Sequence, residues 1–135
     1  MPLKNHGTLM LVGFFAWLFF YIIGIPSDYF TKWSLDEKIL LSLVTFFGAV
    51  PFVGGLVLIF LGGDYVRTSL WAAFYTSVPL FILDYIIVGL NKGEGLHFLI
   101  PHWYITIAYG YVWIELPVIG LALRKLRDDK RTGYL

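Results

Sequence analysis

Four long apolar stretches separated by short polar segments make up most of the chain. A helix needs roughly 20 mostly apolar residues to cross the hydrocarbon of a bilayer. Backbone groups in lipid find no partner outside the protein, so helices are the expected form. The pattern predicts an all-α integral membrane protein, a four-transmembrane-helix bundle within residues 1–124, with a basic cytoplasmic tail over residues 125–135. The predicted spans are about residues 8–25, 39–61, 68–90 and 102–123.

Polar residues and prolines indicate where these helices begin, end and bend. Ser34 followed by Glu37 has the spacing of a capping box, which predicts a helix start just before the second stretch. The sequence NKGEG at residues 91–95 predicts a turn before the fourth helix. Prolines inside a span each remove one backbone hydrogen bond and tend to kink the helix. The spans contain three of them, Pro51, Pro79 and Pro117.

Composition strengthens the membrane interpretation and excludes several kinds of chemistry. Hydrophobic residues make up 59% of the 135-residue chain and charged residues 14%, and the mean hydropathy is +0.76. Soluble domains are roughly 45–50% apolar and about 25% charged. A chain without cysteine has no disulfide, thiolate metal site or thiol redox chemistry. No basic tract has the density that nucleic-acid binding requires, so the expected partner is the lipid bilayer and not nucleic acid.

The placement of lysine and arginine predicts the orientation in the membrane. Cytoplasmic segments of membrane proteins carry an excess of these residues. One side has Lys32, Lys38 and Lys92, and the other has Lys4, Arg67, Arg124, Lys125, Arg127, Lys130 and Arg131. Both termini are therefore expected to face the cytoplasm, and size and loop charge favour a bacterial plasma (inner) membrane. The basic tail is interpreted as an orientation signal with a solvated end, and contact with anionic lipid is the alternative.

Helical periodicity predicts which side of each span faces the bundle interior. Positions seven apart nearly eclipse on a helix, and small residues let two helices approach closely in lipid. We therefore expect another helix to pack on the glycine stripe of the second span. Polar and small residues on the third and fourth spans are expected to face inward. The three stripes are Gly48, Gly55 and Gly62; Ala73, Ser77, Asp84 and Asn91; and Tyr104, Ala108, Tyr111, Glu115 and Ala122.

Asp84 and Glu115 are the acids that fall inside the predicted spans. An ionised acid at mid-bilayer costs on the order of 3 kcal/mol or more, and neither span offers a lysine or arginine beside it. Each acid must hold a proton, bind a cation or face water. At about 1.5 Å per residue they lie about 10 Å and about 20 Å from the outer side, which suits a ladder of polar sites better than a paired acid and base. A structural hydrogen bond to a neighbouring helix is the alternative for each.

Three functional classes remain open. The first is a pocket that binds, and in a dimer could transport, a small protonatable, cationic or lipid-like ligand. The second is an accessory subunit of a larger membrane complex. The third is a membrane enzyme acting on an isoprenoid, sterol or quinone with Glu115 as acid or base. It ranks last because the sequence has no recognisable nucleophile–base pair, phosphate-binding glycine loop or metal cluster.

The first class assigns roles to particular side chains. Glu115 binds the ligand or a proton and Asp84 connects the pocket to the outer side, with the other pocket residues being Ser77, Tyr104, Tyr111 and Trp113. His97, His102 and Trp103 are expected at the outer mouth, where the spacing of the histidines is a weak metal-ligand pattern and interfacial positions are favoured. No metal and no cofactor is expected. The predicted partners are a small apolar or cationic ligand, and a homodimer or larger membrane complex.

Overall fold

The computed structural model describes residues 1–133, which are helical with no β-strand in that range. The α-helices are α1 (Leu3–Gly24), α2 (Leu35–Val44), α3 (Val50–Leu61), α4 (Tyr65–Asp84) and α5 (Trp103–Thr132). Two 3₁₀ segments, η1 (Ile25–Ser27) and η4 (Gly95–Leu99), and two π-helical segments, η2 (Thr45–Ala49) and η3 (Tyr85–Leu90), complete the chain order. They combine into four rods long and apolar enough to cross a membrane, which are Leu3–Ser27, Leu35–Leu61, Tyr65–Leu90 and Trp103–Thr132. The prediction of four such helices is confirmed.

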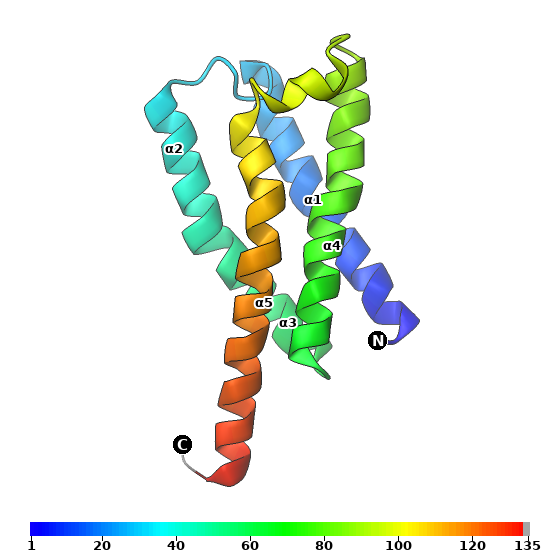
Figure 1. The fold of residues 1–135 in the computed structure, drawn as a ribbon, viewed down its shortest axis with the longest axis vertical. Coiled ribbons are helices and arrows are strands. Elements are labelled where there is room, and N and C mark those ends of the chain that lie inside the picture. Colours follow the sequence, from blue (N-terminus) through cyan, green and yellow to red (C-terminus); the bar gives the residue numbers. More distant parts are fainter. Residues whose placement is uncertain (134–135) are drawn as a thin grey trace.

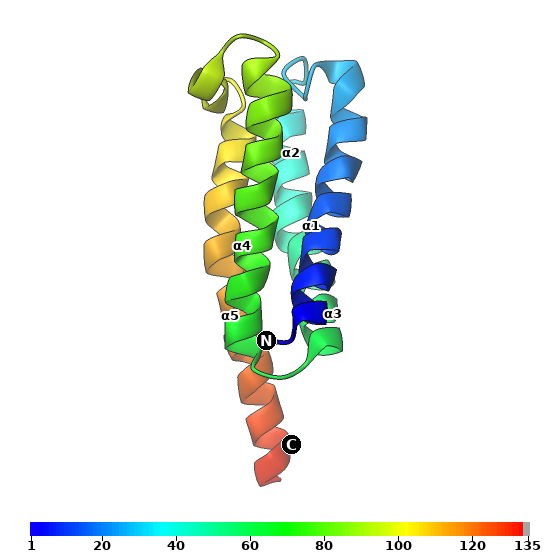
Figure 2. The same cartoon turned by 90° about the vertical axis from the view of Figure 1, so that its right-hand side faces the viewer.

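The rods run up and down around a shared axis (Figures 1 and 2). α5 packs mainly against α4 and against α3, and α1 packs against α4. The N-terminus and the end of α5 lie at one end of the bundle, here called the terminal end (Figure 1). Residues 25–34 and 91–102 lie at the opposite end, here called the distal end. The tail expected over residues 125–135 continues α5 to Thr132 and projects past the other rods, and residues 134–135 lie outside the described part.

Glycines bring α4 close to its two neighbours. A Cβ atom on Gly120 of α5 would lie 2.5 Å from Ser69 Oγ, and one on Gly13 of α1 would lie 2.7 Å from the Tyr75 carbonyl oxygen. Both distances are shorter than van der Waals contact, so these positions require glycine. The backbones of α1 and α5 can therefore approach α4 in the way that small residues permit in membrane bundles.

The predicted glycine stripe of the second span is not a helix contact. A Cβ atom on Gly48, Gly55 or Gly62 would meet nothing within 4 Å. The neighbouring Gly54 faces α5 instead, where its Cβ would lie 2.7 Å from Leu116 Cδ2. The contact face of α3 is thus one residue, or about 100°, away from the stripe expected from the sequence.

The predicted capping box is present at the start of α2, and the three prolines within the rods have different effects on their helices. The Glu37 amide donates to Ser34 Oγ at 3.2 Å and the Ser34 amide donates to Glu37 Oε2 at 2.7 Å, which confirms the capping box. Helices α4 and α5 continue through Pro79 and Pro117, whereas π-helical η2 directly precedes α3, which has Pro51 in its first turn. The second rod therefore carries its irregularity at mid-length. Insertions of this kind often occur where a helix borders a functional site.

Candidate functional site

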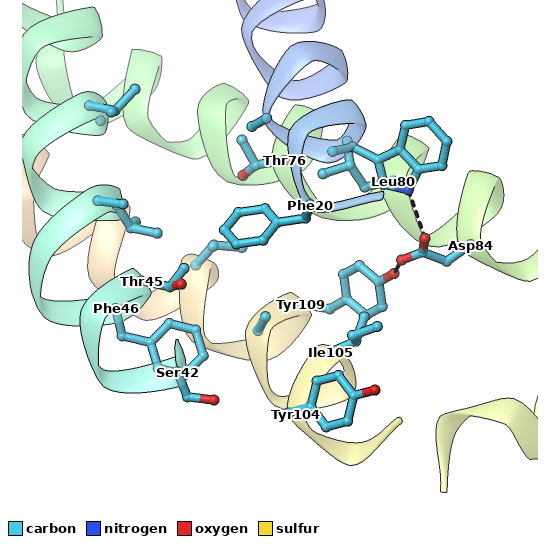
Figure 3. A pocket seen from close by; sticks show the side chains of 18 of the residues that line it. Phe20, Ser42, Thr45, Phe46, Thr76, Leu80, Asp84, Tyr104, Ile105 and Tyr109 are labelled. Carbon is cyan, nitrogen blue, oxygen red and sulfur yellow. Dashed lines mark hydrogen bonds between the residues drawn. The ribbon is translucent and has the colours of Figure 1, made fainter. Parts of the chain in front are cut away.

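A cavity of about 290 Å³ lies between the four rods (Figure 3). All of α1, α2, α3, α4 and α5 contribute to its wall, and so do both π-helical segments. The backbone of α1 does not come close to that of α2 or α3, and the cavity lies between them. Its volume is at the lower end of the range of roughly 300–1,000 Å³ that is typical of small-molecule sites.

The wall of the cavity is aliphatic toward the terminal end, and its acid and tyrosines lie toward the distal end. Aliphatic side chains such as Leu9, Val57 and Leu116 line the first part, and hydroxyls from Ser42, Thr45 and Thr76 are scattered along the wall. The second part contains Asp84 and the rings of Trp17, Tyr21, Tyr29, Tyr104 and Tyr109. A molecule with a hydrocarbon body and one polar group matches this division.

Asp84 is the charged residue on the cavity wall, and it is 9% exposed. The indole Nε1–H of Trp17 donates to its Oδ1 at 2.7 Å, and the hydroxyl of Tyr109 donates to its Oδ2 (Figure 3). These two groups, here called the donor pair, come from α1 and α5 while Asp84 ends α4. The carboxylate is therefore fixed in direction by three rods.

No positive side chain of residues 1–133 neutralises Asp84. The ion pairs of this part of the chain join Lys92 to Asp28, Arg124 to Asp128 and Arg127 to Asp128, and none reaches Asp84 within 4.0 Å. The donor pair is neutral, so it supplies dipoles and no counter-charge. A carboxylate in this position has free acceptor capacity on both oxygens.

Aromatic rings surround the polar part of the cavity. Trp17 stacks on Tyr21 with 4.9 Å between ring centroids, and Tyr21 lies 5.7 Å from Tyr29. Tyr104 meets Phe30 edge to face at 6.2 Å. Five of these aromatic residues were not predicted from the sequence: Trp17, Tyr21, Tyr29, Phe30 and Tyr109. On α5, however, Ile105, Tyr109, Val112, Leu116 and Gly120 follow helical spacing along one face. That stripe, with one tyrosine among apolar and small residues, was the available signal.

The structure separates Glu115 from the cavity. Glu115 is half-buried, it does not line the wall, and its Oε2 is buried without a hydrogen-bond partner among the described residues. The buried residues of α5 are Tyr104, Val112, Leu116 and Gly120. Val112 and Leu116 each follow by one residue a member of the expected stripe, Tyr111 or Glu115, so the buried face is rotated away from Glu115. The cause is packing, because Gly120 must face α4 and Leu116 must face Gly54.

Of the six predicted pocket residues, Asp84 and Tyr104 line the cavity and four do not. The four are Glu115, Ser77, Trp113 and Tyr111. The indole Nε1–H of Trp113 donates to Ser77 Oγ at 2.9 Å, which joins α5 to α4. The ring of Tyr111 packs on Phe46 at 4.5 Å between centroids. Ser77, Trp113 and Tyr111 therefore join helices outside the cavity wall.

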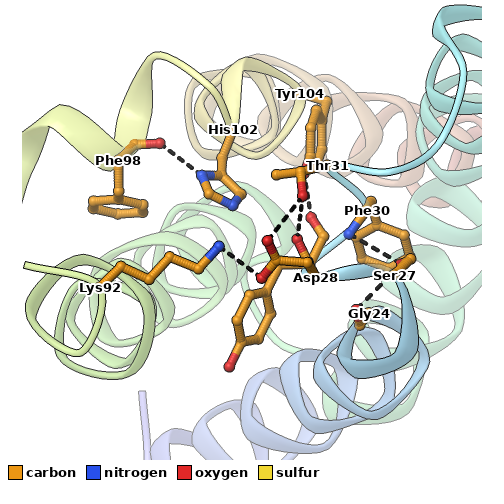
Figure 4. A network of polar contacts seen from close by, with 10 residues as sticks. Gly24, Ser27, Asp28, Phe30, Thr31, Lys92, Phe98, His102 and Tyr104 are labelled. Carbon is orange, nitrogen blue, oxygen red and sulfur yellow. Dashed lines mark hydrogen bonds and ion pairs between the residues drawn. The ribbon is translucent and has the colours of Figure 1, made fainter. Parts of the chain in front are cut away.

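The three residues predicted at the outer mouth differ in burial, and Figure 4 shows one of them, His102, beside Phe98. His97 is exposed, whereas His102 is 1% exposed with its Nδ1 2.9 Å from the Phe98 carbonyl oxygen. Because a carbonyl only accepts, Nδ1 carries the proton, and the buried Nε2 has no partner within residues 1–133. Trp103 is half-buried and meets Tyr104 edge to face at 5.7 Å. The two histidines therefore do not act as a pair.

The distal end of the cavity is closed by the segment that follows α1. Lys92 Nζ lies 2.8 Å from Asp28 Oδ1, and the Tyr104 hydroxyl donates to the Tyr29 carbonyl oxygen. Asp28, Tyr29 and Phe30 have φ angles of 53°, 56° and 67°, a left-handed conformation that costs about 1–2 kcal/mol per non-glycine residue. Packing and these two contacts together hold the strained segment over the mouth (Figure 4).

Asp28 and Tyr29 at the mouth have pKa values shifted in opposite directions, for different reasons. The hydrogen bond from the Lys92 ammonium lowers the pKa of the Asp28 carboxyl below 3.8. Burial, assisted by the neighbouring Tyr21 hydroxyl, raises the pKa of Tyr29 from 10.0 to about 12. At neutral pH the mouth therefore contains an ion pair and a neutral phenol.

The donor chemistry gives no indication of a metal centre. Residues 1–133 contain no group of three or more histidine, cysteine, aspartate or glutamate side chains placed to hold a metal ion. Asp84 has an indole and a phenol as neighbours, and these donate hydrogen bonds to a carboxylate. The arrangement suits recognition of a polar or positively charged organic group.

Comparisons with family models, curated proteins and solved structures find no match for this chain. No activity or ligand can therefore be carried over from a relative.

Proposed function

We propose that this chain is an integral membrane protein that binds a small hydrophobic molecule carrying a cationic or hydrogen-bonding group inside its helix bundle. The observation that carries the proposal is the cavity walled by all four rods with Asp84 as its charged residue. Binding sites of this kind are mostly apolar with a few placed polar groups. An acid inside a membrane segment is a functional candidate for the same reason, since it is costly to keep there.

The outer surface of the rods supports membrane placement. Phe47, Phe52 and Phe60 are 72%, 70% and 82% exposed, and many other large apolar side chains are also uncovered. In water such a surface would be unfavourable, whereas in lipid it is the expected boundary. The lysine and arginine asymmetry favours both termini on the cytoplasmic side, with the distal end outside. A bacterial plasma membrane is the proposed location.

The side of the cavity between α1 and α2–α3 supports access from the bilayer. The backbones of these helices do not approach each other closely and both line the cavity, while the distal end is closed by the Asp28–Lys92 ion pair and the Tyr104–Tyr29 hydrogen bond. A hydrophobic ligand dissolved in the membrane would reach the cavity sideways. Transport across the membrane would in addition require these distal contacts to open.

The proposed polar anchor is Asp84 and not Glu115. Glu115 does not line the cavity, so neither ligand binding at Glu115 nor an enzyme using it as acid or base gains support from the geometry. Tyr104 lines the cavity, whereas the other predicted aromatic residues, Tyr111 and Trp113, do not. Trp17 and Tyr109 line it instead and donate hydrogen bonds to Asp84.

Filling the cavity tests ligand binding. Ala108 lines the cavity, and the adjacent Ile107 is 50% exposed on the outside of the same helix. Native mass spectrometry of the protein released from lipid nanodiscs should detect a retained small molecule in the wild type. Ala108→Phe should lose it and the matched control Ile107→Phe should keep it. Equal occupancy in all three proteins, or none in the wild type after exposure to membrane extract, would contradict the proposal.

A cysteine-labelling experiment tests the orientation. The chain has no cysteine, so a single introduced thiol reports its own location. Glu94→Cys, in the distal loop, should react with a membrane-impermeant maleimide in intact cells. Lys130→Cys, near the end of α5, should react only after permeabilisation. The reverse pattern would place the termini outside.

A further inference from the structure

We infer that the polar end of the cavity is a site for an ammonium group, so the ligand class is a hydrophobic amine with one positive charge. This inference rests on the proposed function and specifies its ligand. It starts from the way in which Asp84 is held by the donor pair on one side and left open on the other. Figure 3 shows the Tyr109 hydroxyl pointing at the Asp84 carboxylate at one side of the cavity.

The donor pair prepares the carboxylate for a third partner. Each Asp84 oxygen accepts one hydrogen bond, from Trp17 Nε1–H at 2.7 Å or from the Tyr109 hydroxyl. A carboxylate has about four lone-pair positions, so each oxygen keeps one for a ligand. An ammonium has three N–H donors and no acceptor, and its hydrogen bonds to a carboxylate are the charge-assisted kind.

The chain does not provide the missing positive charge. Of the three lysines near the distal end, Lys92 pairs with Asp28 at 2.8 Å and Lys38 Nζ lies 3.4 Å from the Thr31 carbonyl oxygen. The third, Lys32, does not line the cavity, and neither does His102. A buried charge without a partner is strongly unfavourable. A ligand that brings one positive charge would therefore neutralise the site, whereas an anionic ligand would be rejected.

Aromatic faces next to Asp84 add a second attraction for a cation. Ammonium groups bind over aromatic rings within about 6 Å of the centroid. The protein already contains two such contacts at its distal end, with Lys92 Nζ 5.3 Å from the Tyr29 ring and Lys38 Nζ 5.5 Å from the Tyr104 ring. Both rings also line the cavity from the same end. Together with Trp17 and Tyr21, they give this end of the cavity an aromatic wall.

The remainder of the cavity selects the body of the ligand. Leu9, Val57, Ala72 and Leu116 form an apolar wall toward the terminal end. Burial of a hydrocarbon chain against these residues contributes to the binding free energy by the same amount for an amine and for a neutral alcohol of the same length. The polar end must therefore supply the discrimination, and this makes the inference testable with matched probes.

Decylamine and decanol are the probes, measured at neutral pH in nanodiscs of zwitterionic lipid by native mass spectrometry. Occupancy of Ala108→Phe serves as the background for non-specific partition of each probe. The wild type should bind the amine roughly tenfold or more tightly than the alcohol, as expected for a charge-assisted contact. Asp84→Asn should reduce this ratio to about one, and the matched control Glu115→Gln should keep it.

The outcomes separate the inference from the proposed function. Equal binding of both probes to the wild type, or an amine preference that survives Asp84→Asn, overturns the ammonium site while leaving a hydrophobic ligand site in place. Failure of both probes to exceed the Ala108→Phe background overturns the two together. The wild-type comparison needs no variant at Asp84, so it decides even if Asp84→Asn does not fold.

Discussion

Two acids inside the helical rods, Asp84 and Glu115, lie in opposite surroundings. Asp84 is 9% exposed and receives the donor pair from α1 and α5. Glu115 is half-buried on α5, and its Oε2 has no hydrogen-bond partner in the described chain. The carboxyl group of Asp84 thus belongs to a hydrogen-bond network of three helices, whereas the buried oxygen of Glu115 has no hydrogen-bond partner among the described residues.

The difference shows that depth in the membrane does not decide what an acid does. By the count along the helices, Glu115 lies deeper than Asp84, at about 20 Å against about 10 Å from the distal side. The donors that converge on Asp84 belong to α1 and α5, which are distant in the sequence from α4. Convergence of separate helices, and not position within one helix, makes the Asp84 site.

The largest expected effect on stability comes from removing Asp84, and removal of Glu115 is the comparison. Asp84→Leu leaves the Trp17 indole and the Tyr109 hydroxyl buried without an acceptor, and each lost partner costs about 1–3 kcal/mol. We expect the free energy of unfolding to fall by about 2–5 kcal/mol. Glu115→Leu removes an oxygen that has no partner, so it should be neutral or stabilise by up to about 2 kcal/mol.

Unfolding in mixed micelles, titrated with sodium dodecyl sulfate and followed by circular dichroism, measures both changes. The signs should differ between the two variants, because one change breaks a satisfied network and the other removes an unsatisfied group. Destabilisation by Glu115→Leu as large as that by Asp84→Leu would mean that Glu115 has a partner in the membrane. The comparison between the two sites would then be lost.

The rotation of α5 that separates Glu115 from the cavity depends on Gly120. In Gly120→Ala the new methyl would lie 2.5 Å from Ser69 Oγ and 2.7 Å from the Tyr65 carbonyl oxygen. Overpacking of this kind costs typically about 1–3 kcal/mol. Gly55→Ala is the matched control, since its methyl would meet nothing within 4 Å. In detergent, the melting temperature should fall clearly for Gly120→Ala and hardly change for Gly55→Ala.

The sequence was sufficient to predict the four rods and the capping box at Ser34, because both follow from local patterns. The orientation of each rod about its own axis was harder. Polar residues were assigned to the interior of α5, whereas Leu116 and Gly120 face inward and Glu115 does not. A rule based on polarity fails here because a membrane interior and a bundle interior are both apolar, so packing shape decides the rotation.

The candidate site was predictable only in part for the same reason. Asp84 stood out as an acid within a span, and Tyr104 as a tyrosine near its end of the bundle. Trp17 and Tyr109 gave no signal as partners, since their role depends on the contact of α1 and α5 with the end of α4. Hydrogen bonds between residues 67 and 25 positions apart in the sequence cannot be inferred from helical periodicity.

Removing one member of the donor pair should have an intermediate effect. Tyr109→Phe leaves the Asp84 Oδ2 without its donor, which should lower the free energy of unfolding by about 1–2 kcal/mol. Tyr111→Phe is the control from the same helix, since the Tyr111 hydroxyl makes no hydrogen bond within residues 1–133 and its ring still packs on Phe46. The control should change stability by less than about 0.5 kcal/mol. Equal losses in the micelle titration would show that the Tyr109 hydroxyl does not stabilise Asp84.

The smallest expected effect concerns Asp28, an acid that obtains a full counter-charge from Lys92. The Lys92 hydrogen bond lowers the pKa of Asp28 in the folded protein below 3.8, so the stabilisation is complete above that pH and is lost as the pH falls through the lower folded value. Lys92→Met should therefore be less stable than the wild type at neutral pH, and the difference in melting temperature should narrow in acid. It should be small, because the two side chains are 25% and 47% exposed. If the difference in melting temperature stays constant with pH, the effect of Lys92 comes from its contact with the Tyr29 ring. The control Lys130→Met, in the tail, should have the melting temperature of the wild type at every pH.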